Sequence, residues 1–204
     1  MKEMYFDTEV TFTDPKMIEA LRSGQKVPFN AEKVKLITIQ YQLLKPDGTP
    51  EGPLQVFKEW ESSEEAILKR AWGLLNPRTL WDFAPVGYNI HFDLAMLKIR
   101  GAAYGINYPE WYIYHDLPTI DIKGICLGMN AFNFKDSGLD KFTGKRTSGA
   151  LVPVWYQDGD YGKIMDYIRN ETDEFVKFYA RLKEIMPGLR EKFGVPGGKS
   201  GEGN

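Results

Sequence analysis

Three β-prone runs follow one another within the first 60 residues of the chain, at Met4–Val10, Val34–Leu44 and Leu54–Trp60. Each run is rich in β-branched, aromatic and other apolar residues, which favour extended backbone. The turn-forming sequence Pro46-Asp47-Gly48-Thr49-Pro50 separates the second run from the third. Consecutive strands joined by short connections pair in antiparallel fashion. The first part of the chain therefore predicts three antiparallel strands.

The pattern changes after residue 60, where strand-like and helical segments alternate. Ser62 and Glu65 predict a capping box for a helix that ends before Asn76-Pro77. The other predicted elements are a short helix at Met17–Leu21, a strand at Val86–Tyr88, a helix at Ile90–Ala103 capped by Asn89, a strand at Thr119–Ile122, a helical piece at Ser137–Phe142 and a long amphipathic helix at Tyr161–Met186. We therefore expect an α/β fold: a five-stranded mixed sheet, its first three strands antiparallel, with helices packed on it.

The 204 residues of the chain suit one domain with its own hydrophobic core. We expect this domain to cover residues 1–195 and the Gly-rich residues 196–204 to be a disordered tail. A single cysteine and two histidines argue against an internal disulfide and against a zinc site rich in either residue. The sequence has no apolar run of about 18 residues and no secretory signal pattern, which predicts a cytoplasmic protein with no membrane partner.

Two carboxylates one residue apart stand out in the first strand-like run. Side chains alternate faces along a strand, so Asp7 and Glu9 project from the same side. Like charges at that distance repel each other, and a divalent cation between them removes the repulsion. Mg²⁺ and Mn²⁺ prefer oxygen ligands of this kind. A solvated face on an edge strand explains the same pair without a metal. This strand alone does not decide between a metal site and a solvated face.

A second motif begins at Asn89, the expected cap of the helix at Ile90–Ala103. The segment Asn89 to Asp93 places Asp93 in the first helical turn, where the helix dipole favours an anion. Helix capping alone accounts for this acid. The combination of F-D-x-E upstream and N-x-x-x-F-D downstream is more specific than either motif by itself.

These two motifs, Phe6 to Glu9 and Asn89 to Asp93, resemble those of the DnaQ-like, or DEDD, 3′-to-5′ exonucleases of the ribonuclease H-like fold. The resemblance is strongest to the branch that includes the proofreading domain of family B DNA polymerases, and the predicted order of elements extends it over nearly the whole chain. It implies two divalent metal ions, Mg²⁺ or Mn²⁺, held by four acids. It also implies that nucleotides are removed one at a time from the 3′ end of DNA or RNA.

The fourth acid departs from the motif of this family. One branch uses Y-x-x-x-D in the last helix, whereas this chain has Tyr167 followed by Glu171 and then Asp173. Helical spacing puts Glu171 on the apolar stripe of that helix and Asp173 on the solvated side, so we favour Glu171. The resemblance then implies that Asp7, Glu9, Asp93 and Glu171 hold the metals and that Tyr167 orients the attacking water. The extra methylene of glutamate adds about 1.5 Å of reach, which would slow, retune or abolish catalysis.

Several residues are candidates for contact with the nucleic acid. Phe6, Asn89 and Phe92 would wall the pocket for the terminal nucleotide, although both phenylalanines fit a hydrophobic core equally well. The net charge of −2 gives no overall attraction to nucleic acid, so we look to the local basic segment from Lys123 to Arg146, which contains Lys145 and Arg146. A solvated surface loop explains this segment equally well. Aromatic pairs at Trp111-Tyr112 and Trp155-Tyr156 would suit base stacking or packing.

The leading hypothesis is thus a metal-dependent 3′-to-5′ exonuclease that acts on single-stranded or frayed nucleic acid. A catalytically impaired nucleic-acid-binding or scaffold protein that kept the exonuclease fold is the main alternative, and a ribonuclease H-like endonuclease is a third. The sequence does not distinguish DNA from RNA, and it does not give the oligomeric state.

Overall fold

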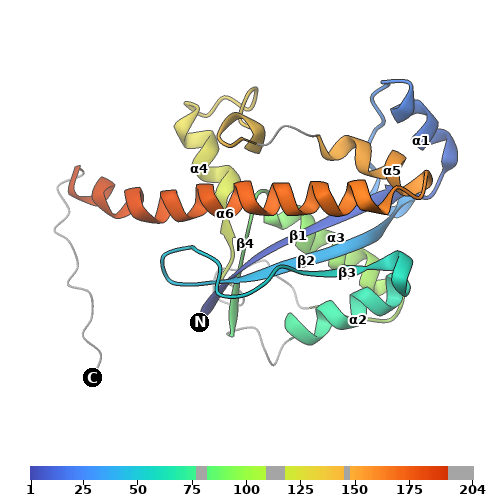
Figure 1. Cartoon of the computed structure of the whole chain (residues 1–204), viewed down its shortest axis with the longest axis horizontal. Coiled ribbons are helices and arrows are strands. Elements are labelled where there is room, and N and C mark those ends of the chain that lie inside the picture. Colours follow the sequence, from blue (N-terminus) through green and yellow to red (C-terminus); the bar gives the residue numbers. More distant parts are fainter. Residues whose placement is uncertain (77–81, 109–117, 145–147, 193–204) are drawn as a thin grey trace.

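The computed structural model describes residues 1–76, 82–108, 118–144 and 148–192, and it contains a five-stranded mixed sheet (Figure 1). The strands are β1 (Lys2–Phe12), β2 (Val34–Leu44), β3 (Gln55–Lys58), β4 (Phe83–Gly87) and β5 (Ile120–Asp121). Their spatial order is β3-β2-β1-β4-β5. The first three strands pair antiparallel, whereas β4 joins β1 in parallel and β5 joins β4 in parallel. The predicted mixed sheet is confirmed, with β1 at its centre.

Helices cover both faces of this sheet. The α-helices are α1 (Pro15–Arg22), α2 (Glu64–Leu74), α3 (Ile90–Ala102), α4 (Ile122–Met129), α5 (Val152–Gln157) and α6 (Tyr161–Lys192). Short 3-10 turns lie at η1 (Ala31–Lys33), η2 (Glu59–Glu61), η3 (Leu139–Lys141) and η4 (Gly149–Leu151). The long helix α6 crosses one side of the strands in Figure 1, with α4 and α5 along its length.

The alternation of side chains along β1 divides the core into two halves. Met4 and Phe6 point to the face that α2 and α3 cover, where they join the buried cluster of Ile67 and Leu94. Tyr5 points to the opposite face, where its ring packs 4.9 Å from that of Phe175 on α6. Since the side-chain period of a strand is two, Asp7 and Glu9 follow Tyr5 onto the α6 side.

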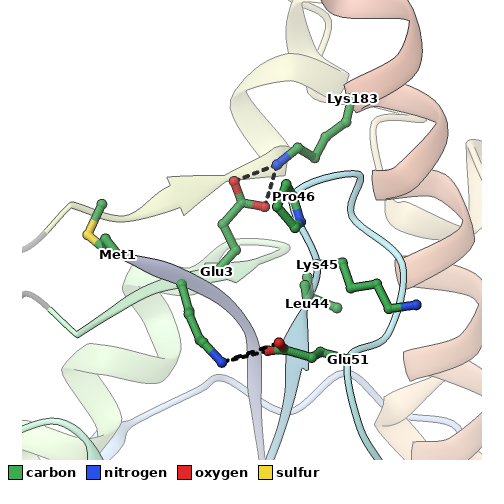
Figure 2. Close-up of a pocket in the computed structure, with 8 residues that line it drawn as sticks. Met1, Glu3, Leu44, Lys45, Pro46, Glu51 and Lys183 are labelled. Carbon is green, nitrogen blue, oxygen red and sulfur yellow. Dashed lines mark hydrogen bonds and ion pairs between the residues drawn. The ribbon is translucent and has the colours of Figure 1, made fainter. Parts of the chain in front are cut away.

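The beginning of β1 is fastened to α6 by a charged contact. Lys183 donates to both carboxylate oxygens of Glu3 at 2.6 Å, and the Tyr179 hydroxyl donates to Glu3 at 2.9 Å. Figure 2 shows Lys183 reaching down to Glu3 at the edge of a pocket that Leu44, Lys45 and Pro46 also line. This contact joins residues from the two ends of the described chain.

Some local predictions were wrong. The cap of α2 is Ser63, not Ser62: the Ser63 hydroxyl accepts from the backbone N–H of Ala66 at 3.1 Å. Asn89 precedes α3, but its φ of 63° is left-handed and its side chain makes no capping hydrogen bond. Its Oδ1 instead accepts from the Lys123 ammonium at 3.2 Å.

The ends of several elements also differ from the prediction. β4 begins at Phe83, earlier than the predicted strand, and α6 continues through Pro187 to Lys192. Between β5 and α6, where the only bounded prediction was the helical piece at Ser137–Phe142, the structure has the short helices α4 and α5 and the turns η3 and η4. The predicted disordered tail, residues 196–204, lies outside the described residues. No helix in the described ranges combines the length and apolar character that a membrane crossing requires.

Candidate metal centre

Three carboxylates converge between β1 and α6. Asp7, Glu9 and Glu171 each offer an oxygen atom, and these atoms lie within 4.8 Å of one another, the one such group of three in the part of the chain that is described. Glu171 is partly buried on α6, whereas Asp173 is exposed. Three hard oxygen donors with a combined negative charge match the ligand preference of Mg²⁺ and Mn²⁺. The donor set therefore fits a divalent cation.

Asp7 is oriented by its neighbours in the sheet. The buried side chain of Gln40, opposite Asp7 on β2, donates from Nε2 to Oδ2 of Asp7 at 2.8 Å. Gln40 in turn accepts from the hydroxyl of Thr38 at 2.9 Å. The Tyr5 hydroxyl also lies 3.3 Å from Asp7 Oδ2, and burial followed by the charge of Asp7 raises the pKa of Tyr5, so it remains a donor. These contacts hold one carboxylate oxygen in place.

The role of Gln40 was not predicted from the sequence, although the pattern of β2 carries a signal for it. Thr38, Gln40 and Gln42 are polar residues that alternate within an otherwise apolar strand. All three are buried. Buried polar side chains require hydrogen-bond partners, so this alternation pointed to a polar feature on the face of the sheet that also carries the acids.

Asp93 lies at the first turn of α3, next to this group but outside it. The pairing of β1 with β4 ends at Tyr5, and farther along β1 the backbone N–H and the hydroxyl of Thr8 donate to Asp93 Oδ1 at 3.0 and 2.6 Å. Only 3% of Asp93 is exposed. Burial first, and then the charge of Asp7, raise the pKa of Asp93 well above its usual range, while the hydrogen bonds from Thr8 oppose this rise.

Tyr167 lies one helical turn before Glu171 and is buried. Burial raises the pKa of Tyr167 above its ordinary value, and the charges of Glu9 and Glu171 add to the effect. The side chain is therefore a neutral phenol that can donate a hydrogen bond. A Cβ at Gly149 would lie 2.8 Å from the Tyr167 oxygen, so this glycine permits a close approach of η4 to Tyr167, which was not predicted.

The residues expected to contact substrate differ in their burial and in their contacts. Phe6 is fully buried in the core, the alternative position that its sequence also allowed. Phe92 is partly buried against the same core and meets the ring of Phe29 edge-on at 5.0 Å. Asn89 is held by Lys123, as described above. Lys145 and Arg146, together with Trp111 and Tyr112, lie outside the described residues.

The second aromatic pair takes part in internal packing. The Tyr156 hydroxyl contacts both Lys35 and Glu59, and the ring of Trp155 lies 6.1 Å from that of Tyr167. These contacts account for the pair without a bound base.

The sheet order, the parallel pairing beyond β1 and the helices on both faces define an α/β protein of the ribonuclease H-like class. Among solved structures, the chain is similar to the family B DNA polymerase from the hyperthermophilic archaeon Pyrobaculum calidifontis, with a TM-score of 0.60 and 17% sequence identity. The match covers 93% of this chain and 25% of that polymerase, so this chain spans about a quarter of its length. The likeness shows a shared fold.

A structure of exonuclease I in complex with the inhibitor BCBP is also similar, with a TM-score of 0.45 and 12% identity over 66% of this chain and 31% of that one. No protein-family model matches the sequence, and no curated protein matches it. At these identities the likeness concerns the fold.

Proposed function

We propose that this chain is a metal-dependent 3′-to-5′ exonuclease that shortens single-stranded or frayed nucleic acid. The observation that carries this proposal is the convergence of Asp7, Glu9 and Glu171 within 4.8 Å on a DnaQ-like fold. Like charges held together at a partly buried site are unfavourable unless a cation or a proton offsets them. Such a cluster is expected where it binds a cation.

Asp7, Glu9, Asp93 and Glu171 would hold the metal ions. When bound, two divalent cations lower the pKa of an attacking water and stabilise the charge on the leaving 3′ oxygen. Without them, the negative cluster repels a phosphodiester, so the acids themselves make substrate binding depend on the metal. This reasoning favours strict dependence on Mg²⁺ or Mn²⁺.

The other residues of the site position groups. Gln40 and Tyr5 fix one oxygen of Asp7, which limits the directions from which that carboxylate can bind a cation. Thr8 restrains Asp93 in the same way. The neutral Tyr167 would donate a hydrogen bond that orients water or a phosphate oxygen, because its raised pKa keeps the phenol protonated.

The direct test incubates the pure protein with single-stranded DNA and with RNA of the same sequence, each labelled at the 5′ end, in Mg²⁺ and in Mn²⁺. The expected result is a ladder that shortens from the 3′ end, is absent in EDTA and is abolished by Asp7→Asn. Asp173→Asn provides the matched control, because it removes an exposed carboxylate from α6.

Other outcomes would replace the proposal with one of its alternatives. Binding of the oligonucleotide without turnover in either metal would identify an impaired binding protein. Cleavage of a closed circular substrate would identify an endonuclease.

A further inference from the structure

One carboxylate oxygen of Asp7 is occupied by hydrogen-bond donors of the protein itself. Gln40 donates from Nε2 to Oδ2 of Asp7 at 2.8 Å, and the Tyr5 hydroxyl donates to the same atom from 3.3 Å. A carboxylate oxygen has two lone pairs, so these two donors take up the directions from which Oδ2 would bind a cation. A cation that binds Asp7 is therefore expected to contact it through the other oxygen.

Asp93 shows the same arrangement. The backbone N–H and the hydroxyl of Thr8 both donate to Oδ1 of Asp93, at 3.0 and 2.6 Å. The two donors meet one oxygen instead of being shared between the two. Two of the four acids proposed to hold the metal ions thus each have one oxygen that accepts from two neutral donors.

The direction of the Gln40 side chain is fixed by its surroundings. Gln40 is fully buried on β2, directly opposite Asp7 in the register of the sheet. The hydroxyl of Thr38, which is also fully buried, donates to Oε1 of Gln40 at 2.9 Å, so the amide nitrogen faces the acid. Turning the amide away would leave buried polar atoms without partners, which costs free energy. Gln40 is therefore a built-in donor to this carboxylate.

The number of oxygens that each carboxylate offers separates Mg²⁺ from Ca²⁺. Ca²⁺ takes about six to eight oxygen ligands in flexible geometry and accepts a carboxylate through both of its oxygens. Mg²⁺ is smaller, requires nearly octahedral geometry and keeps several of its waters, and Mn²⁺ also suits six oxygens in octahedral geometry. Acids that each provide a single oxygen suit the octahedral ions and withhold part of the coordination that Ca²⁺ would use.

We propose that Gln40 is a selectivity-determining residue of the metal centre, which favours Mg²⁺ and Mn²⁺ over Ca²⁺ by holding Oδ2 of Asp7. The inference rests on the proposed function in one respect, that the acids bind a divalent cation. Gln40 is a positioning residue, because it acts through Asp7 and not by contact with the metal or the substrate. Thr8 acts on Asp93 in the same sense.

The first test titrates the metal-free protein with MgCl₂ and, separately, with CaCl₂ by isothermal titration calorimetry, and compares the ratio of the Kd for Ca²⁺ to the Kd for Mg²⁺. Gln40→Met keeps a side chain of similar length without the donor. Loss of a partner that orients a metal ligand typically lowers metal affinity by at least about tenfold. We expect this loss for Mg²⁺ but not for Ca²⁺, so the ratio should fall about tenfold. Adding Tyr5→Phe removes the second donor and should lower the ratio further.

Gln42→Met is the matched control. Gln42 is a buried glutamine on the same strand, but its amide donates to the carbonyl of Gly52 at 2.7 Å and not to an acid. This variant should keep the ratio of the wild type. A general loosening of the sheet would weaken the binding of both ions alike and leave the ratio unchanged, so the ratio separates selectivity from a loss of structure. Thermal melts in EDTA check that each variant folds.

Two results would overturn the role of Gln40. One is an unchanged ratio in the folded Gln40→Met/Tyr5→Phe variant. The other is equal affinity of the wild type for Ca²⁺ and Mg²⁺, since the centre would then have no selectivity to explain.

The second test separates this inference from the proposed function. In the hydrolysis of 5′-labelled single-stranded DNA with Mg²⁺, Ca²⁺ should inhibit Gln40→Met at a concentration about tenfold lower than it inhibits the wild type, as the change in affinity predicts. Binding of Mg²⁺ by the wild type without hydrolysis in Mg²⁺ or Mn²⁺ would reject the exonuclease, while the calorimetric ratio would still decide the role of Gln40. Failure of the wild type to bind either ion would reject both.

Discussion

Glu171 on α6 offers a carboxylate oxygen within 4.8 Å of those of Asp7 and Glu9 on β1. Shortening it in Glu171→Asp would withdraw the carboxylate by about 1.5 Å. Since a misplacement of about 1 Å can cost on the order of a hundredfold in rate, we expect single-turnover nuclease rates to fall about a hundredfold. A faster rate in Glu171→Asp would contradict this expectation and would show that glutamate is the impairing residue.

Repulsion within the cluster has a consequence for stability. Glu9→Gln removes one of three neighbouring negative charges, so we expect the variant to melt above the wild type in EDTA, by a few degrees if about 1 kcal/mol is relieved. In Mn²⁺ the wild type should melt above Glu9→Gln. An ion whose free concentration is about 100 times its Kd adds about 2.7 kcal/mol to the free energy of unfolding of the protein that binds it. Thermal melts in the two buffers test this expectation, and an equal gain from Mn²⁺ in both proteins would contradict it.

The buried thiol of Cys126 gives a prediction for alkaline pH. Burial, with a contribution from Asp121, raises the pKa of Cys126 to about 11. The unfolded chain loses this proton near pH 8.5, whereas the native protein keeps it, so the stability from the buried thiol is present at lower pH and is lost between about 9 and 11. Cys126→Ala should show a weaker decline of unfolding free energy over this range. Iodoacetamide should label native Cys126 slowly and the urea-unfolded protein rapidly, as mass spectrometry can measure.

At the scale of elements, Glu64 joins α2, β2 and α3. Its buried carboxylate accepts from the Leu36 N–H and the Arg100 guanidinium, each at 2.8 Å, and from the Tyr104 hydroxyl at 2.9 Å. Breaking a buried ion pair by removing one partner costs about 3–5 kcal/mol. We expect Glu64→Gln to lose somewhat less, about 2–4 kcal/mol, because the amide retains one acceptor.

Urea denaturation measures this loss, with Glu65→Gln as the matched control. Glu65 is the next residue on α2, and its ion pair with Lys69 is exposed to solvent. Exposed pairs contribute about 0–1 kcal/mol, so this variant should be nearly neutral. Similar losses in the two variants would refute the bridging role of Glu64.

Elements with a strong local pattern were predictable from the sequence. The strand predicted at Val34–Leu44 coincides with β2 because a long β-prone run ends at unambiguous turn residues. The bounds of α4 and α5 were not predicted because the local signals for these helices are weaker. α4 is an eight-residue helix capped by Asp121, whose side chain accepts from the Lys123 N–H, and α5 has six residues that include Pro153. Short helices gain most of their stability from tertiary packing, which local sequence does not reveal.

Some features of the candidate site were likewise predictable from the sequence, and others were not. The common face of Asp7 and Glu9 follows from the period of a strand, and helical spacing favoured Glu171 over Asp173; the structure places these three acids together. The hydrogen bonds from Thr8 to Asp93 and from Gln40 to Asp7 depend on how β1 registers against its neighbours, and on where β4 stops. Spacing along one strand cannot determine these contacts.

Considered as a whole, the molecule joins its first strand to its last helix through side-chain contacts of Glu3 and Tyr5. Glu3 and Lys183 form a partly buried ion pair, so we expect a coupling energy of about 1 kcal/mol between Glu3→Gln and Lys183→Gln in a double-mutant cycle. Urea denaturation of the wild type, the two single variants and the double variant measures this coupling energy. Strict additivity would mean that the ion pair does not contribute to joining β1 to α6.

The distance in sequence between the acids of β1 and Glu171 also matters while the protein is being made. During translation, Asp7 and Glu9 leave the ribosome long before α6 exists, so the growing chain carries two of the three clustered acids without the third. Contacts between residues so far apart form late, because closing a long loop precedes the gain from the contact. A nuclease built in this way would emerge beside its own messenger with an incomplete centre, and it would acquire its cutting ability only after the last helix had folded back onto the first strand.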